Sequence, residues 1–159
     1  MEPWLSGTKP HPDPIVRAVF HSFQQVREDL AKWSAGLTDQ QTWQSIEGLA
    51  PLGLQLRHIA GSVDRLVAYA KGEQLNEEQL RALKNEMQPG ASLQELLADL
   101  HVSLEAAERS ITGFTDFAAP REVGRRKLPT TLGGLLVHLA EHTQRHLGQA
   151  IVTCKLLTR

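Results

Sequence analysis

Apolar residues recur three and four positions apart in four long stretches of the chain, which is the spacing of an amphipathic helix. No stretch of useful length alternates with a period of two, so no β-strand is predicted. The four stretches cover about residues 14–33, 52–72, 92–113 and 130–157. Four amphipathic helices bury their apolar faces most simply in an all-α four-helix bundle, which is the predicted fold class.

Residues that start and stop helices delimit these stretches. Asp13 followed by Pro14 suits a helix start, and Ser92 opens a capping-box pattern. A short extra helix is expected at 76–87, between the second and third long helices, and a helical turn at 38–43. The long connections allow an order of helices other than up-down-up-down.

The predicted organisation is an extended N-terminal arm, residues 1–13, followed by a single bundle domain, residues 14–159. The arm is rich in proline, which disfavours regular structure. The stretch 114–129 is expected to be an irregular loop. It carries a basic group that could attract an anionic thiol cofactor or could simply be solvated: Arg121, Arg125, Arg126 and Lys127.

The composition is that of a soluble globular domain, with 41% hydrophobic and 22% charged residues. The formal charge of -1 gives no basic field to attract nucleic acid. No apolar run approaches the roughly 20 residues of a membrane span, and no signal peptide is recognised, so a cytoplasmic protein is expected. Cys154 is the only cysteine, which excludes an internal disulfide, and its place on an apolar stripe predicts core packing.

Three histidines follow one another at intervals of four in the last predicted helix: His138, His142 and His146. Side chains four apart share one helical face, so two neighbouring imidazoles can reach one metal ion. The outer pair is about 12 Å apart along the helix, too far for all three to bind the same ion. On a helical wheel, His146 lies roughly 50° from the centre of the apolar stripe, His142 roughly 90° and His138 roughly 130°. The inward pair, His142 and His146, is therefore the candidate metal-binding pair.

Histidines elsewhere in the chain could supply a third ligand. His58 lies roughly 130° from the apolar centre of its helix, which is typical of a residue at the lip of a site or on the surface. His21 and His101 fall on the other two helices and are equal alternatives, whereas His11 in the arm is the weakest candidate. Spacing alone leaves the third ligand open.

Several motifs of known chemistry are absent from the sequence. There is no H-E-x-x-H of a zinc protease and no Glu-x-x-His of a di-iron bundle. There is also no Gly-rich phosphate loop and no G-x-S-x-G elbow of a hydrolase. No catalytic residue is assigned from motifs, and the catalytic residues stay unknown.

Two segments resemble the DinB-like (DinB/YfiT superfamily) proteins. The segment 54–66, LQLRHIAGSVDRL, is similar to the second helix of that family, and the segment 135–149, LLVHLAEHTQRHLGQ, to its last helix. The resemblance covers about residues 14–157 and implies a four-helix bundle. It also implies that the metal ligands are His58, His142 and His146, which selects His58 over the alternatives.

The resemblance implies a divalent metal ion, nickel or zinc above all, with a coordination position left open for water or a thiol. Related proteins are thiol-dependent transferases or metal-dependent hydrolases, and many form homodimers. The expected partners are therefore a small-molecule substrate or thiol cofactor and a possible second copy, with no nucleic acid and no membrane. A non-catalytic metal-binding or stress-response bundle is the alternative. Asp64 or Glu141 is the expected hydrogen-bond partner of a ligand nitrogen.

Overall fold

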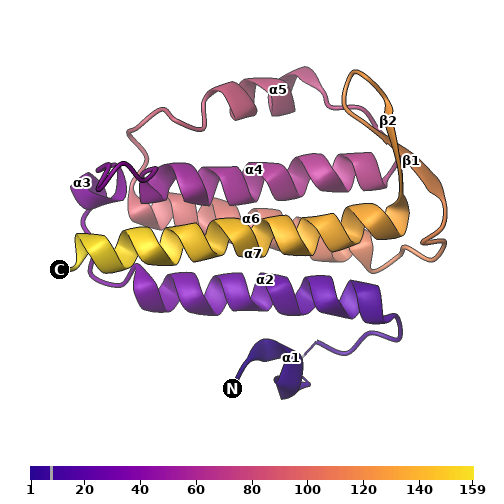
Figure 1. The fold of residues 1–159 in the computed structure, drawn as a ribbon, viewed down its shortest axis with the longest axis horizontal. Coiled ribbons are helices and arrows are strands. Elements are labelled where there is room, and N and C mark those ends of the chain that lie inside the picture. The colour runs from indigo at the N-terminus through magenta and orange to yellow at the C-terminus, as the bar shows by residue number, and fades with distance from the viewer. Residues whose placement is uncertain (8) are drawn as a thin grey trace.

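The computed structural model of the protein describes residues 1–7 and 9–159, and within them four long helices form a bundle (Figure 1). Helix α7 packs against both α2 and α4, and α4 also packs against α6, so that α2 and α4 occupy opposite corners. The predicted all-α four-helix bundle is confirmed. The bounds of its helices are α2 Pro14–Trp33, α4 Leu52–Ala70, α6 Leu93–Ile111 and α7 Leu132–Leu157.

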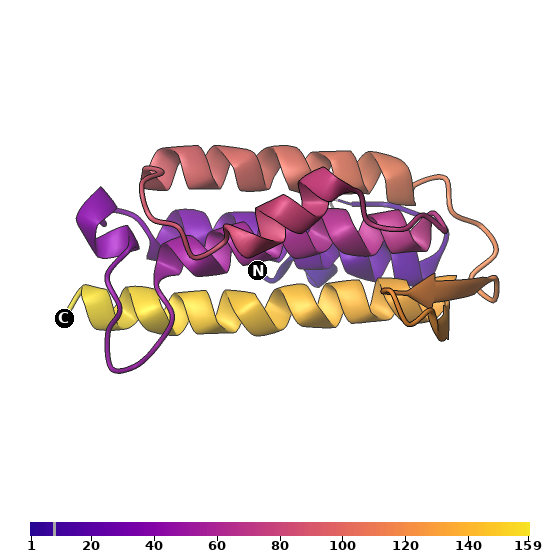
Figure 2. The ribbon, with the colours of Figure 1, turned by 90° about the horizontal axis from the view of Figure 1, so that it is seen from above.

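The helices do not follow an up-down-up-down order. In Figure 1, α2 and α7 run in one direction while α4 and α6 run in the other. The chain therefore returns along the bundle between α4 and α6, through residues 71–92. This crossover segment contains helix α5, Glu77–Lys84, which lies along the outer side of α4 (Figure 2) and confirms the predicted extra helix.

Caps and apolar stripes explain why these residues form these helices. The Asp13 side chain accepts hydrogen bonds from the backbone N–H groups of Ile15 and Val16, and Ser92 forms the predicted capping box with Glu95. A further capped turn, α3 Asp39–Thr42, lies between α2 and α4.

None of the described helices is long and apolar enough to cross a membrane. The residues at the centre of the core are fully buried and include Phe23, Leu56, Ile59, Leu104, Leu136 and Leu139.

The prediction of no β-strand was wrong for the connection between α6 and α7. Strand β1, Pro120–Val123, pairs in antiparallel fashion with β2, Leu128–Thr131. Four residues per strand are too few for an alternating pattern to emerge, and backbone hydrogen bonds stabilise the pair. The Arg121 Nε donates to the Ala70 carbonyl at 2.6 Å, which ties this hairpin to the end of α4.

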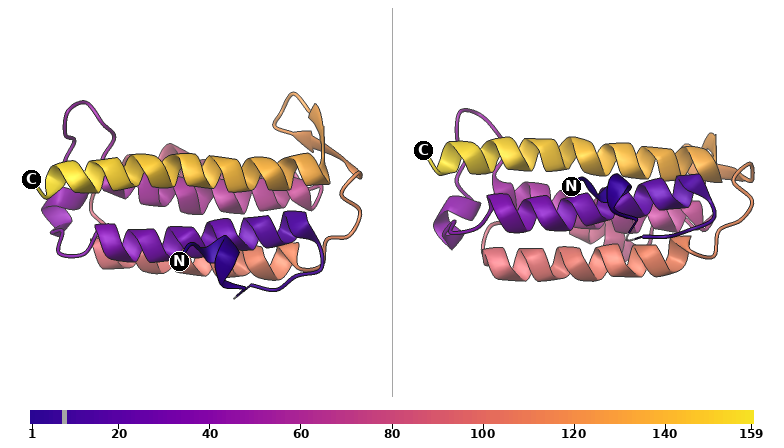
Figure 3. Two further views of the ribbon diagram at one scale, coloured as in Figure 1. Left: turned by 60° about the horizontal axis from the view of Figure 1, so that its bottom comes forward. Right: turned by 90° about the horizontal axis from the view of Figure 1, so that it is seen from below.

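The N-terminal arm was predicted to be extended, but part of it is helical. Helix α1, Pro3–Ser6, forms one turn that begins with proline, a residue suited to the first helical position. Pro3 is buried, and Figure 3 shows this turn lying beside α2. Trp4 is 63% exposed and donates to Glu2. Thr8, which belongs to the expected arm, lies outside the described residues.

Candidate metal centre

Three histidine side chains meet between α4 and α7. His58 comes from the second turn of α4, and His142 and His146 come from successive turns of α7. The Nε2 atoms of His58 and His142 are 3.2 Å apart, and one nitrogen from each of the three rings lies within 4.8 Å of the other two. Among the described residues, this is the group of histidine, cysteine or carboxylate side chains whose spacing could hold a metal ion.

The distances in the cluster suit a shared metal ion. Two imidazole nitrogens bound at about 2.0–2.1 Å to one tetrahedral ion are about 3.4 Å apart. The observed separation of 3.2 Å between two Nε2 atoms is close to that value. The ring of His146 lies 4.3 Å from that of His58 and 4.6 Å from that of His142, measured between centroids, so the third ring is also within reach.

The other histidines lie outside this cluster. His138 is exposed and pairs with Glu141 through a 3.2 Å contact. His101 is exposed on α6, and His21 lies near Trp4 of the N-terminal segment. The His11 ring contacts Phe20. The structure therefore places His58, and neither His21 nor His101, beside the pair on α7.

A buried carboxylate that was not predicted contacts His58. Glu86, in the turn after α5, accepts from the His58 Nδ1 at 2.7 Å and forms a 2.9 Å ion pair with Arg65. The expected partners bind elsewhere, since Asp64 accepts from Gln79 and Glu141 contacts His138. Glu86 and His58 are 28 residues apart on different elements, so no spacing rule connects them.

One sequence signal could have pointed to this contact. Gly61 occupies the interior of α4, one turn after His58, where glycine costs a helix about 1 kcal/mol relative to alanine. Such a residue often marks a close approach by another group. A Cβ atom added at Gly61 would lie 2.7 Å from Arg65 and 3.0 Å from Glu86.

The ring of His146 has a partner within the bundle itself. Its Nδ1 lies 2.9 Å from Oε1 of Gln55, a residue of α4 that is only 4% exposed. The Gln55 carbonyl accepts a hydrogen bond there, so Nδ1 carries the proton. The Nε2 atom of the neutral ring then carries the lone pair that a ligand bond needs, and the side chain of Gln149 also hydrogen-bonds with this ring.

Burial and charge keep two of the three rings neutral. Burial lowers the pKa of His146 to about 4, with further contributions from His58 and His142. The pKa of His142 is also lowered, first by burial and then by His58. Neutral imidazole is the form that binds a metal ion. Burial alone would raise the pKa of Glu86, but the hydrogen bond with His58 and the charge of Arg65 lower it overall.

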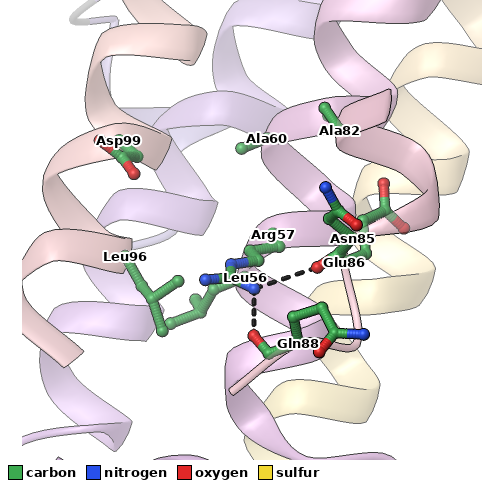
Figure 4. Close-up of a pocket in the computed structure, with 10 residues that line it drawn as sticks. Leu56, Arg57, Ala60, Ala82, Asn85, Glu86, Gln88, Leu96 and Asp99 are labelled. Carbon is green, nitrogen blue, oxygen red and sulfur yellow. Dashed lines mark hydrogen bonds between the residues drawn. The ribbon is translucent and has the colours of Figure 1, made fainter. Parts of the chain in front are cut away.

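Glu86 also lines a pocket of about 500 Å³ between α4, α6 and the end of α5 (Figure 4). Its wall includes Arg57, whose guanidinium donates to the carbonyl oxygens of Asn85 and Gln88. None of the three clustered histidines lines this pocket. The pocket therefore adjoins the segment that carries Glu86 and does not open onto the histidine cluster.

Two other candidates are remote from the chemistry of the cluster. Cys154 is fully buried, and burial raises the pKa of its thiol to about 11, as expected of a core residue and not of a nucleophile. The basic residues of the β1–β2 hairpin lie at the end of the bundle where α7 begins (Figure 1). That end is about 15 Å along the helix from His142.

Comparison with known proteins identifies the family. A search of curated proteins finds no match for the chain. The sequence profile of the DinB superfamily matches residues 22–150, which contain the three clustered histidines and Glu86. Since this match spans most of the bundle, the chain belongs to the DinB superfamily.

Proposed function

We propose that the chain binds one divalent metal ion through His58, His142 and His146. The observation that supports this most strongly is the convergence of three rings from two helices, with two Nε2 atoms 3.2 Å apart. Three imidazole ligands leave a fourth position for water or a substrate atom, as in catalytic zinc sites. Zinc and nickel are the proposed metals, because both accept imidazole nitrogen.

The proposed activity is transfer of a low-molecular-weight thiol to a small molecule, or hydrolysis of a small molecule. A bound ion of this kind lowers the pKa of a water or thiol at its open position. The residues of the chain hold the rings in place, since Glu86 and Gln55 accept hydrogen bonds at the Nδ1 atoms of His58 and His146. The resemblance to DinB-like proteins, some of which are thiol-dependent transferases or metal-dependent hydrolases, is the reason for proposing this activity class.

A non-catalytic metal-binding protein is the second candidate, and one observation favours it. Both oxygens of Glu86 are engaged, one by His58 and the other by Arg65. A carboxylate held in this way is poorly placed to move a proton for a substrate. Gln55, the other hydrogen-bond partner of the cluster, cannot act as a base at all.

Metal content and turnover separate these possibilities. Purified protein is loaded with zinc or nickel, desalted and subjected to elemental analysis. The wild type and His138→Ala are expected to retain one ion per chain, and His58→Ala to lose it. Saturating metal should stabilise the fold by about 2.7 kcal/mol at a hundred times Kd. Less than about a tenth of an equivalent in the wild type, without that stabilisation, would contradict the metal centre.

Activity is then measured with the metal-loaded protein, a set of low-molecular-weight thiols and an electrophilic acceptor. The enzyme proposal expects turnover that His146→Ala lacks. Tight metal binding without turnover of thiols or esters would support the non-catalytic candidate instead.

A further inference from the structure

We infer that Glu86 is a positioning residue for His58. Gly61, which has no side chain, leaves the space on the surface of α4 that the Glu86 side chain needs to reach the ring. The inference rests on the proposed metal centre, of which the His58 Nε2 is one ligand. It adds a residue from the crossover segment, residues 71–92, to a site otherwise built from α4 and α7. The site would then depend on a segment outside the four-helix bundle.

The contact between Glu86 and His58 determines which ring nitrogen carries the proton. A carboxylate can only accept hydrogen bonds, so the His58 Nδ1 must donate across the 2.7 Å separation. The Nε2 atom of the neutral ring then carries the lone pair of the ring. That atom faces the His142 Nε2 at 3.2 Å, which is the side on which the cluster converges.

Arg65 fixes the carboxylate in turn. Its Nη2 lies 2.9 Å from the second oxygen of Glu86, and its side chain is 10% exposed. His58 and Arg65 are seven residues apart on α4, two turns along one face, so the carboxylate bridges them. The hydrogen bond with His58 and the ion pair with Arg65 together favour this orientation of the carboxylate, and the ion pair is a charge contact in which Glu86 Oε1 accepts no hydrogen bond.

Gly61 lies between these two residues on α4 and leaves room for the bridge. A methyl group there would lie 2.7 Å from Arg65 Nη1 and 3.0 Å from Glu86 Oε1. Any other residue at this position would therefore require the ends of these two side chains to shift. The Glu86 side chain passes over the helix here, which explains why this residue is a glycine.

Polar contacts hold the crossover segment against α4. Arg57 donates to the carbonyl oxygens of Asn85 and Gln88, on either side of Glu86 (Figure 4), and Gln79 donates to Asp64 at 2.8 Å. None of the residues of α5 is buried. The position of Glu86 thus depends on these hydrogen bonds and its own ion pair, together with Leu75 and Ala91 of the same segment, which pack against the apolar core.

The isosteric variant Glu86→Gln tests the positioning role without removing side-chain volume. Arg65 would keep the amide oxygen, so the amide NH₂ would face His58 and donate to its Nδ1. The proton of His58 would then move to Nε2 and block the ligand atom. Zinc affinity, measured by competition with a chromophoric chelator, should fall 10–100-fold, as for other hydrogen-bond partners of metal ligands.

Glu141→Gln is the matched control, because Glu141 also pairs with a histidine and an arginine but lies outside the cluster. Its zinc affinity should stay within about twofold of the wild type, as expected for an exposed ion pair. Equal losses in the two variants would overturn the inference, as would unchanged zinc affinity in Glu86→Gln.

Long-range ¹H–¹⁵N spectra of the metal-free protein show directly which ring nitrogen of His58 carries the proton. The expected result is a His58 protonated on Nδ1 in the wild type and on Nε2 in Glu86→Gln. An unchanged ring in the variant would overturn the inference. A wild type that binds no zinc would instead overturn the metal centre, while these spectra would still decide whether Glu86 positions His58.

Discussion

Two histidines of this protein each contact a glutamate that also pairs with an arginine. In the inner group, His58, Glu86 and Arg65, the side chains are 24%, 9% and 10% exposed. In the outer group, His138, Glu141 and Arg145, the corresponding values are 49%, 51% and 54%. The two groups have the same chemistry and differ in burial and in the elements that carry them.

The outer group is local, since its three residues follow one another on one face of α7 at helical spacing. Its charges are hydrated, and exposed pairs of this kind contribute about 0–1 kcal/mol to stability. The inner group joins α4 to the crossover segment and is largely removed from water. Buried charges are costly unless each has its partner. Replacing any one member of the inner group should therefore lower the free energy of unfolding.

Removal of the arginine should expose this difference most strongly. Arg65→Met keeps the apolar stem of the side chain but leaves Glu86 buried without its cation. The variant is expected to lose about 3 kcal/mol of unfolding free energy, at the lower end of the range for broken buried pairs. Arg145→Met should lose less than about 1 kcal/mol.

Urea unfolding of the two variants, followed by circular dichroism, measures the loss. A double-mutant cycle between Arg65 and Glu86 should give a coupling energy above about 1 kcal/mol, since the two side chains are in contact. Equal midpoints for Arg65→Met and Arg145→Met would show that burial does not distinguish the two groups.

Acid should destabilise the metal-free fold through the clustered histidines. Burial lowers the pKa of His146 to about 4, against an ordinary value of 6.5. Between these two values the unfolded chain binds a proton that the folded chain does not, so stability falls as the pH falls from 6.5 to 4. The slope for one group is at most about 1.4 kcal/mol per pH unit, and solvent screening of the partly exposed ring narrows the pH window over which it acts.

The measurement is the unfolding free energy at several pH values in the presence of a chelator. His146→Gln is expected to flatten the slope in this window. His138→Gln, in the exposed group, is expected to follow the wild type. A slope that survives in His146→Gln would assign the acid sensitivity to other groups.

The sequence predicts the local features of this protein better than the contacts between distant segments. Periodicity is a property of neighbouring residues, so it predicts the four long helices and the inward face that His142 and His146 share. His58 lies off the apolar stripe of its helix, and only the family resemblance selected it. Gln55 and Glu86 contact their histidines across 91 and 28 residues, and such pairings depend on how the elements pack. The β1–β2 hairpin was missed because strands of four residues carry too little pattern.

The smallest expected difference in stability is between two glycine-to-alanine variants. This comparison tests whether Glu86 needs the space at Gly61. Gly61 and Gly148 both lie inside long helices, where alanine is favoured by about 1 kcal/mol. A Cβ at Gly148 would meet no atom within 4 Å, so Gly148→Ala should stabilise the protein by about that amount. A Cβ at Gly61 would meet the side-chain ends of Arg65 and Glu86 at 3.0 Å or less, and because these ends can shift, the cost should lie near the lower end of the about 1–3 kcal/mol range for overpacking.

Gly61→Ala is therefore expected to be less stable than Gly148→Ala by about 1 kcal/mol in urea unfolding. It should also bind zinc more weakly, because the displaced carboxylate no longer holds His58. Gly148→Ala should keep the zinc affinity of the wild type. If both variants are stabilised alike and bind zinc alike, then Glu86 reaches His58 without needing the gap at Gly61, and the glycine requires another explanation.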